Sequence, residues 1–357
     1  VSYTATEDQL TDEVLARVVA SCGGKELDNR MLDFYYWQQY YTLMSNYGSY
    51  ASYFIDTSTP FDQQMCMFDD TRTWQQYFLQ AAITNYENVT AIWQEARLAG
   101  FQLSQEDQDY LDELDGQITV AAASYSYGSA DEYLQMAYGP AATLTSYHAF
   151  VERQITASAY LQVLVDEKPY TEDDISKYYD DNADSYAGNG IEKSDVKMVN
   201  VRHILIQPEG KNDDGTYTDE AWAEAEKKAN DLLTEWQNGE HTEDSFAFMA
   251  AENSQDPGSV ENGGLYEDIY PGKMVDEFDA WCFDPARQPG DTGIVKTSYG
   301  YHIMYFSSTG EHAYWYVRAE EDYLNELSVS VLQEVAAKFE VTESEQNAAI
   351  VDIMQQN

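Results

Sequence analysis

Two histidines, one aspartate and one threonine carry the polar chemistry that this sequence offers. His203 lies in the apolar run Arg-His-Ile-Leu, and Asp256 opens the turn Asp-Pro-Gly-Ser. Thr297 precedes His302 by five residues, with Ser-Tyr-Gly-Tyr between them. A neutral imidazole carries one hydrogen-bond donor and one acceptor, so two imidazoles can exchange these roles by changing tautomer. Each group alone is ordinary, because a histidine in a strand is usually a core residue and Asp before Pro-Gly is usually a turn residue.

Met274 and Phe278 could add an apolar slot beside these polar groups. Their spacing of four residues places both side chains on one face of a helix, although such a pair is usually only the core face of a short helix. A hydrolase that uses His302 with a serine is disfavoured, since the sequence has neither a nucleophile elbow nor an ordered triad. The other histidines are scattered singly, and we predict no metal site and no cofactor.

The segment that carries these residues switches between strand and helix periodicity. Residues 196–206 alternate as a strand does, with His203 on one face and Ile204 on the other. The elements expected after this strand are a helix from Thr218 to Gly239, a helix from Thr242, a Gly-rich turn, a short helix from about Pro271 to Phe283, and strands at 292–297 and 300–307. The order β-α-α-β-α-β-β predicts an α+β domain.

These residues, in this order and at these intervals, resemble the parvulin-type peptidyl-prolyl cis/trans isomerases, in particular extracytoplasmic foldases of the PrsA and SurA kind. The resemblance implies a four-stranded antiparallel sheet with helices. It also implies catalytic roles for four residues, namely His203, Asp256, Thr297 and His302. Met274 and Phe278 match the floor of the pocket that takes the proline ring.

Tyr266 is the one clear departure from the pattern of that family. The family commonly has Gly-Gly-Asp-Leu-Gly after the turn, whereas this chain has Gly-Gly-Leu-Tyr-Glu at residues 263–267. Tyr266 therefore matches the position of a leucine in the substrate pocket, and we assign it to substrate binding. The change affects the shape of the proline pocket and leaves the efficiency of catalysis open.

The rest of the chain is predicted to be mainly helical. Helices are expected at about 60–100, 104–127, 129–139, 140–168 and 171–182, and again in the tail. We predict four segments: a helical chaperone-like domain at 1–186, a linker at 187–195, the isomerase domain at 196–308 and a helical segment at 309–357. By resemblance, the isomerase domain is inserted between two parts of a SurA-like chaperone domain, and the last segment packs on the first.

The charge of the chain restricts its partners. A net charge of −45, spread over the whole chain, argues against binding nucleic acid or an anionic membrane surface. It is explained by solubility, or by attraction of basic client proteins. Most of the 30 tyrosines lie before residue 196, and they form either an aromatic core or a groove that holds unfolded chains.

The cellular location is inferred from the resemblance alone. The chain begins at Val1 without a hydrophobic leader, which is expected of a trimmed chain and does not argue against secretion. No run of 18 apolar residues is present, and the three cysteines form no Cys-x-x-Cys motif. The resemblance implies an extracytoplasmic protein, a lipoprotein on the surface of a Gram-positive-type cell. Its partners would be unfolded or partly folded exported proteins with X-Pro bonds.

Overall fold

Short polar side chains start the helices of this chain. Thr73, Thr143 and Thr218 each accept a hydrogen bond from a backbone N–H of the first helical turn. The helices that they cap are α3 (Trp74–Leu98), α6 (Leu144–Asp166) and α9 (Asp219–Asn238). Thr242 caps α10 (Glu243–Asn253) in the same way, as its place in the sequence predicts.

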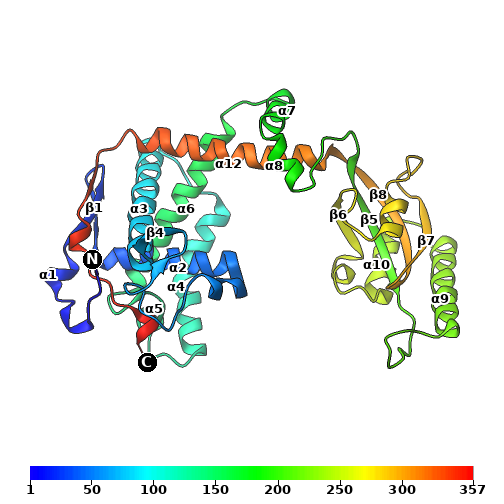
Figure 1. Cartoon of the computed structure of the whole chain (residues 1–357), viewed down its shortest axis with the longest axis horizontal. Helices are drawn as coiled ribbons and strands as arrows, with labels where there is room; N and C mark the ends of the chain where they lie inside the picture. Colours follow the sequence, from blue (N-terminus) through cyan, green and yellow to red (C-terminus); the bar gives the residue numbers. More distant parts are fainter. Residues whose placement is uncertain (357) are drawn as a thin grey trace. The chain divides into compact units, whose positions relative to one another are not determined.

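The computed structural model describes residues 1–356 as two units (Figure 1). Unit 2 is Tyr170–Tyr323, and unit 1 consists of Val1–Pro169 and the described residues from Leu324 onward. The helix α12 (Tyr314–Ala336) therefore contributes residues to both units. These divisions differ from the domain boundaries expected after residues 186, 195 and 308, which stay a prediction.

Unit 1 is a set of helices around an aromatic core. Besides α3 and α6, its helices are α1 (Asp12–Leu15), α2 (Asn29–Tyr47), α4 (Gln105–Ser124) and α5 (Ala130–Tyr138). Figure 1 shows α3 and α6 side by side. The core includes Phe34, Tyr35, Trp37 and Trp74, each almost completely buried. Full burial of one such ring contributes roughly 2–3 kcal/mol, so this core accounts for much of the stability of unit 1.

Two small sheets in unit 1 were not predicted. The hairpin of β3 (Met65–Cys66) and β4 (Asp69–Thr73) occupies part of the stretch at 60–73 where a helix was expected, so that prediction was wrong there. After α12 the described part of the tail contains only short 3₁₀ helices and the strand β9 (Val341–Glu343), which pairs with β1 (Val18–Cys22). Together with β2 (Lys25–Asp28), these strands form a sheet in the order β2-β1-β9.

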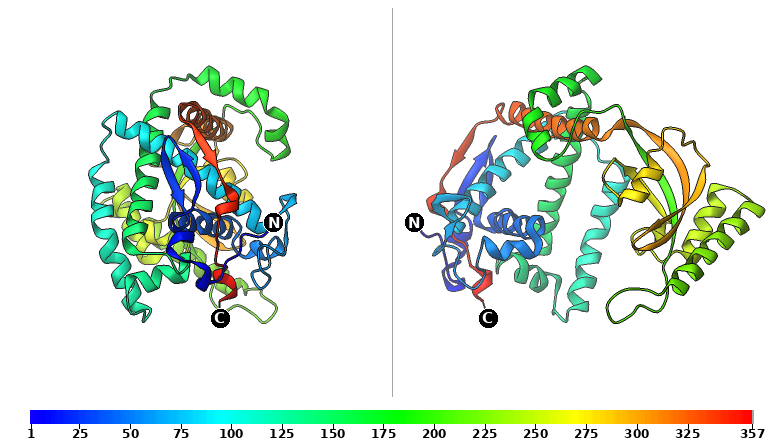
Figure 2. Two further views of the ribbon diagram at one scale, coloured as in Figure 1. Left: turned by 90° about the vertical axis from the view of Figure 1, so that its left-hand side faces the viewer. Right: turned by 45° about the vertical axis from the view of Figure 1, so that its right-hand side comes forward.

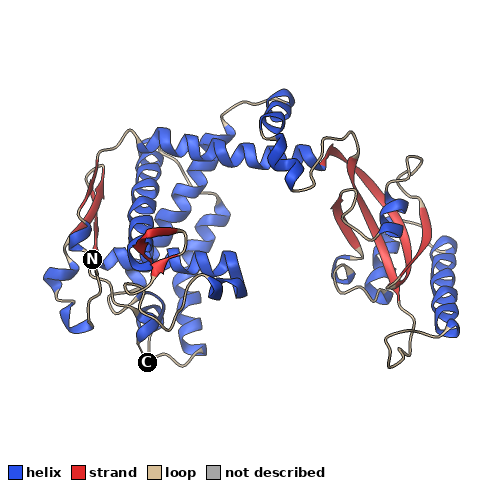
Figure 3. Cartoon of the chain, in the orientation of Figure 1, coloured by secondary structure: helices blue, strands red, loops and turns tan. Residues whose placement is uncertain are grey.

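Unit 2 contains a four-stranded antiparallel sheet, shown in red in Figure 3. Its strands are β5 (Lys197–Ile206), β6 (Leu265–Ile269), β7 (Thr292–Thr297) and β8 (Gly300–Ala313), in the spatial order β6-β5-β8-β7. With α9, α10 and α11 (Asp276–Cys282), the chain order is β-α-α-β-α-β-β. The predicted α+β fold class with this sheet is confirmed.

Each face of this sheet buries a different set of side chains. Ile204 and Ile206 pack with α9 and α10 against Trp236 and Phe246. Figure 2 shows α9 lying against the strands. Val201 and its neighbours on the other face pack with Phe278 of α11. The alternation in β5 therefore separates a purely structural face from the face that carries His203.

The segment predicted as a linker is attached to neighbouring helices by hydrogen bonds. It follows α7 (Glu172–Asp181), and its first two residues belong to the end of α8 (Ala183–Gly188), where no helix was predicted. The Tyr179 hydroxyl donates to the Ile191 carbonyl at 2.8 Å, and the Trp315 indole N–H donates to the Ser194 carbonyl at 2.8 Å. Lys193 lies over the rings of both Tyr179 and Trp315. These contacts fix the entry to the sheet.

Cys22, Cys66 and Cys282 are all buried free thiols. Within residues 1–356, each helix is too short or too polar to cross a lipid bilayer.

Candidate active site

The two histidines come from adjacent strands of the unit 2 sheet. In the register of β5 and β8, His203 lies opposite Met304 and His302 lies opposite Leu205. The two histidines are thus diagonal neighbours on one face, which is within reach for ring side chains. Their Nδ1 atoms are 2.9 Å apart, and the rings are nearly parallel. Both side chains are buried, with exposed fractions of 3% and 5%.

Asp256 binds the outer nitrogen of His203. Its Oδ2 atom lies 2.8 Å from His203 Nε2 and accepts hydrogen bonds from Ser259 Oγ at 2.6 Å and the Tyr266 hydroxyl at 2.8 Å. Its other oxygen accepts from the Gly258 backbone N–H at 3.2 Å. The hydrogen bond with His203, followed by those from Ser259 and Tyr266, holds the pKa of Asp256 well below its usual range, although burial opposes this. The carboxyl group is therefore ionised at neutral pH.

Thr297 binds the outer nitrogen of His302. Its hydroxyl is buried and lies 2.8 Å from His302 Nε2, and it accepts a hydrogen bond from the Tyr299 backbone N–H at 3.1 Å. Burial, and then the neighbouring His203, lowers the pKa of His302 to about 4. His302 is therefore neutral at physiological pH.

When His203 is neutral, the ionised Asp256 fixes the direction of every hydrogen bond in this chain. A carboxylate can only accept, so His203 donates from Nε2 and its Nδ1 is left as an acceptor. His302 must then donate from Nδ1, and its Nε2 accepts from the Thr297 hydroxyl. The result is one tautomer for each ring, with every donor oriented toward Asp256.

Apolar side chains cover the histidine pair. The ring of Phe278 stands edge-on to both imidazoles, with centroid distances of 5.3 Å to His203 and 5.5 Å to His302. Met274 and Tyr266 pack against the same cluster and are partly buried. The site thus combines an apolar surface with a hydrogen-bonded imidazole pair, in which His302 is neutral, and with the ionised Asp256.

A glycine-rich turn places β6 close to β5. Gly264 has φ +76°, and a Cβ atom added there would overlap the carbonyl oxygen of His203. Arg202 holds this turn through hydrogen bonds to the carbonyls of Asn262 at 3.1 Å and Gly263 at 3.0 Å. The turn is therefore needed for the strand pairing that carries the site.

The structure brings together all seven residues assigned from the sequence, although their roles stay proposals. His203, Asp256, Thr297 and His302 form one hydrogen-bonded chain. Sequence reasoning missed Ser259, which is 2% exposed and contacts both Asp256 and His203. The signal that could have found it is its place three residues after Asp256, where a turn lets a serine reach back to the aspartate.

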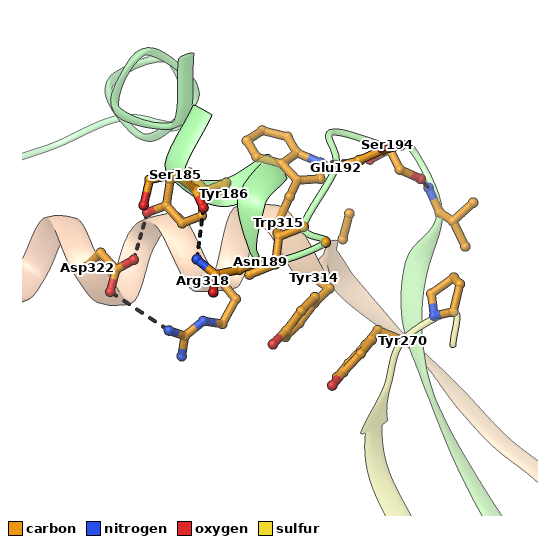
Figure 4. Close-up of a pocket in the computed structure, with 15 residues that line it drawn as sticks. Ser185, Tyr186, Asn189, Glu192, Ser194, Tyr270, Tyr314, Trp315, Arg318 and Asp322 are labelled. Atoms are coloured by element: carbon orange, nitrogen blue, oxygen red, sulfur yellow. Dashed lines mark hydrogen bonds and ion pairs between the residues drawn. The ribbon is translucent and has the colours of Figure 1, made fainter. Parts of the chain in front are cut away.

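A separate cleft of about 670 Å³ lies elsewhere in unit 2, at the junction of α8, α12 and the segment after β6 (Figure 4). Figure 4 shows the stacked rings of Tyr270 and Tyr314, whose centroids are 3.8 Å apart. Asp322 accepts a hydrogen bond from the Tyr186 hydroxyl at 2.7 Å and lies 4.0 Å from Arg318. None of the residues assigned to the active site lines this cleft.

Comparison with protein families identifies the part of the chain that carries the site. Residues 189–308 match the PPIC-type PPIASE domain. The chain is 31% identical to foldase protein PrsA 1 of Listeria innocua over 106 residues, which are 30% of this chain and 29% of that protein. It is 44% identical to foldase protein PrsA of Geobacillus sp. over 80 residues, 22% of this chain and 27% of that protein. It is 35% identical to chaperone SurA of Pseudomonas savastanoi over 107 residues, 30% of this chain and 22% of that protein.

Each of these matches spans less than a third of the relative's own length. Among solved structures, PrsA from Bacillus subtilis aligns with 18% identity and a TM-score of 0.34, over 78% of this chain and 93% of that chain. The foldase PrsA from Lactococcus lactis aligns with 11% identity and a TM-score of 0.36, over 93% and 96% of the two chains.

Proposed function

We propose that this chain, whose residues 189–308 form a parvulin-type peptidyl-prolyl cis/trans isomerase domain, is a foldase that isomerises X-Pro bonds in unfolded proteins. The observation that carries the proposal is the hydrogen-bonded His203–His302 pair, held between Asp256 and Thr297 and covered by Phe278. This arrangement fits a reaction in which no covalent bond is made or broken.

The reaction needs only a change in the electronic state of one amide. Resonance raises the barrier to rotation about a peptide bond to about 18–20 kcal/mol, and the twisted transition state loses that resonance. The planar amide carries partial negative charge on its oxygen. A carboxylate such as Asp256 that faces this oxygen disfavours the planar form relative to the twisted one.

The apolar residues would make the site selective for a proline ring. Met274, Phe278 and the ring of Tyr266 would hold the proline ring in a dry slot, where electrostatic effects are stronger than in water. The histidine pair would keep Asp256 ionised and fixed in position. A reduction of the barrier by about 5–7 kcal/mol corresponds to roughly 10⁴–10⁵ in rate.

A second candidate function is a chaperone whose parvulin domain binds clients with little or no catalysis. Tyr266 favours this candidate, because its hydroxyl takes up one acceptor position on Asp256 that a substrate could otherwise approach. The complete polar chain around the histidines favours activity. We therefore place the catalytic function first.

The test is an isomerisation assay on a short X-Pro peptide, with the full chain and a protease that cleaves only the trans form. We expect His302→Ala to lower the rate at least about tenfold without loss of fold. The matched control is His148→Ala, a histidine in unit 1 that lies far outside the site in the sequence and pairs with Asp115. A wild-type rate equal to the uncatalysed rate would establish the second candidate instead. An unaltered rate in His302→Ala would remove His302 from the mechanism.

We extend this proposal from the isomerase domain to the whole chain and to the client proteins that it would bind. We propose that unit 1 binds unfolded exported proteins while unit 2 isomerises their X-Pro bonds, and that the protein acts outside the cytoplasm, attached by a lipid. Support comes from the matched relatives, which are named foldases and chaperones. A test for unit 1 is suppression of client aggregation after deletion of the isomerase domain.

A further inference from the structure

Exposed apolar side chains gather in one short stretch of unit 1, between residues 47 and 68. Six large side chains there are 40–74% exposed: Tyr47, Tyr50, Tyr53, Met65, Met67 and Phe68. We call these six residues the tyrosine–methionine patch. Single exposed apolar residues are ordinary, but a group of them close in sequence, with ring contacts between Tyr47 and Phe68 and between Tyr50 and Tyr53, points to an interaction site.

The tyrosines of α2 and of the 3₁₀ helix that follows it fall into two groups, one buried and one exposed. Tyr35, Tyr36 and Tyr40 are buried in the aromatic core, as expected of residues that hold a helix in place. Tyr50 and Tyr53, in the 3₁₀ helix at Gly48–Tyr53, are 68% and 74% exposed and stack on each other. The core therefore does not account for them.

Contacts with neighbouring aromatic rings hold two residues of the patch, Tyr47 and Phe68, in position. Phe54 contacts Tyr47 at a centroid distance of 4.8 Å and Phe68 at 5.5 Å, and Phe68 contacts the fully buried Trp74 at 5.4 Å. The Trp74 indole N–H also donates to the Phe54 carbonyl at 3.2 Å. A surface that is ordered before binding loses less conformational entropy when a ligand arrives.

The residue types of the patch suit ligands of varied sequence. Tyrosine offers a large, rigid face and a hydroxyl at a low entropy cost. Met65 and Met67 are flexible and polarisable, and they adapt to side chains of different shape. Such a surface favours apolar segments without requiring one order of residues.

The charge beside the patch selects among apolar ligands. No lysine or arginine occurs between residues 31 and 71, and Asp69 and Asp70 directly follow Phe68. Hydrogen bonds from Thr71 hold the pKa of Asp69 below its usual range, and Arg72 pairs with it at 3.1 Å, whereas Asp70 forms no ion pair within the described residues. Cationic side chains are attracted to such carboxylates and to exposed tyrosine faces. A second copy of this chain, with net charge −45, and an anionic membrane are both repelled.

We propose that the tyrosine–methionine patch binds segments of non-native polypeptide that combine apolar residues with lysine or arginine. This inference rests on the proposed foldase function in one respect, namely that the ligand is a non-native polypeptide. The patch itself belongs to unit 1, whereas the active site belongs to unit 2.

The test uses the full chain and two labelled, disordered peptides in a fluorescence anisotropy titration. One peptide contains leucine and lysine separated by serine, and the other has glutamate in place of each lysine. We expect the lysine peptide to bind more tightly. The triple variant Tyr50→Ser/Tyr53→Ser/Met67→Ser should weaken its binding about tenfold or more. Asp70→Lys should weaken binding of the lysine peptide and strengthen binding of the glutamate peptide.

The matched control is Tyr110→Ser/Tyr125→Ser/Met136→Ser, which removes two tyrosines and one methionine of similar exposure from another part of unit 1. It should leave both affinities unchanged. Equal losses in the two triple variants, no loss in the patch variant, or tighter binding of the glutamate peptide would overturn the proposal. So would a change of molar mass in light scattering caused by the patch variant, because the patch would then bind a second copy. The X-Pro assay on every variant tests the proposed function independently, and its rates should not change.

Discussion

The Nδ1 atoms of His203 and His302 face each other at 2.9 Å, in rings whose planes differ by 17°. One of these nitrogens must donate and the other must accept, so the pair cannot hold two cationic rings at this distance. The lowered pKa of His302 follows from its burial and from this neighbour. Which of the two nitrogens donates and which accepts therefore depends on the groups at the outer ends of the pair, Asp256 and Thr297.

Removal of the Thr297 hydroxyl should leave His302 without its donor. We expect Thr297→Val to lower the rate of X-Pro isomerisation about tenfold, because His302 Nε2 would stay buried without a partner. Thr297→Ser keeps the hydroxyl and should retain most of the activity. Equal rates in the two variants would show that the hydroxyl has no role.

Stability should fall in mild acid because of His302. The pKa of His302 is lowered to about 4 in the folded protein, whereas an unfolded histidine has a pKa of about 6.5. Between these values the unfolded chain binds a proton that the folded chain does not. Acidification from pH 6.5 to pH 4 should therefore cost about 3 kcal/mol, and this loss should be absent in His302→Gln.

The measurement for this prediction is urea denaturation across the same pH range, expressed as the difference between wild type and variant. The difference is needed because Glu87, whose pKa burial raises to about 7, contributes a slope of opposite sign. Its neutral form is favoured in the folded chain, so its contribution to stability is lost as pH rises. Identical slopes in the two proteins would contradict the assignment of His302 as a neutral buried ring.

Tyr266 should help to lower the pKa of Asp256 through its hydroxyl. Its hydroxyl donates to Asp256 Oδ2, and burial together with this carboxylate raises the pKa of Tyr266 to about 12. We expect Tyr266→Phe to raise the pKa of Asp256, as followed by the NMR signal of its carboxyl carbon, because the carboxylate loses one hydrogen-bond donor. The control is Tyr305→Phe, whose ring packs against Trp236 in the core on the other face of the sheet. An unmoved titration of Asp256 would exclude the hydrogen bond in solution.

Gly264 should tolerate no side chain. Gly264→Ala would force a Cβ atom into the His203 carbonyl oxygen, and we expect it to destabilise unit 2 by about 4 kcal/mol or more. Gly210→Ala is the matched control, since Gly210 has φ +75° but no heavy atom within 4 Å of the added Cβ. It should cost only about 1–2 kcal/mol of backbone strain. Thermal unfolding of both variants separates the clash from the strain, and equal losses would show that the close approach is not rigid.

Local patterns predicted the strands and helices of unit 2 because their causes lie within a few residues, whereas the antiparallel sheet and the site were implied by the family resemblance. The alternation in residues 196–206 and the threonine caps before α9 and α10 act through neighbouring backbone groups. The assignment of Met274 and Phe278 relied on resemblance as well as on spacing. The structure places Phe278 against both histidines and packs Met274 in the same cluster as Phe278.

The remaining features depend on contacts that no local pattern encodes. The hairpin at Met65–Thr73 is stabilised by Phe68 packing on Trp74, and its sequence lacks the Gly or Asn that marks tight turns. The hydrogen bond from Tyr266 to Asp256 requires β6 to pair with β5 across the glycine turn. The exposure of Tyr50 and Tyr53 is likewise set by where α2 ends.

The pairing of β9 with β1 makes the sheet of unit 1 depend on residues near the end of the chain. Ala20 lies opposite Glu343, and the Asn347 side chain donates to the Val18 carbonyl, so the first strand of unit 1 is completed by residues made more than 300 positions later. Unit 2 is continuous in sequence and contains all of its own strands. During synthesis or export, unit 2 can fold while β1 of unit 1 still has an unpaired edge. The helical unit is thus the last to finish, and a chain cut short before Val341 would carry a complete isomerase domain on an unfinished partner.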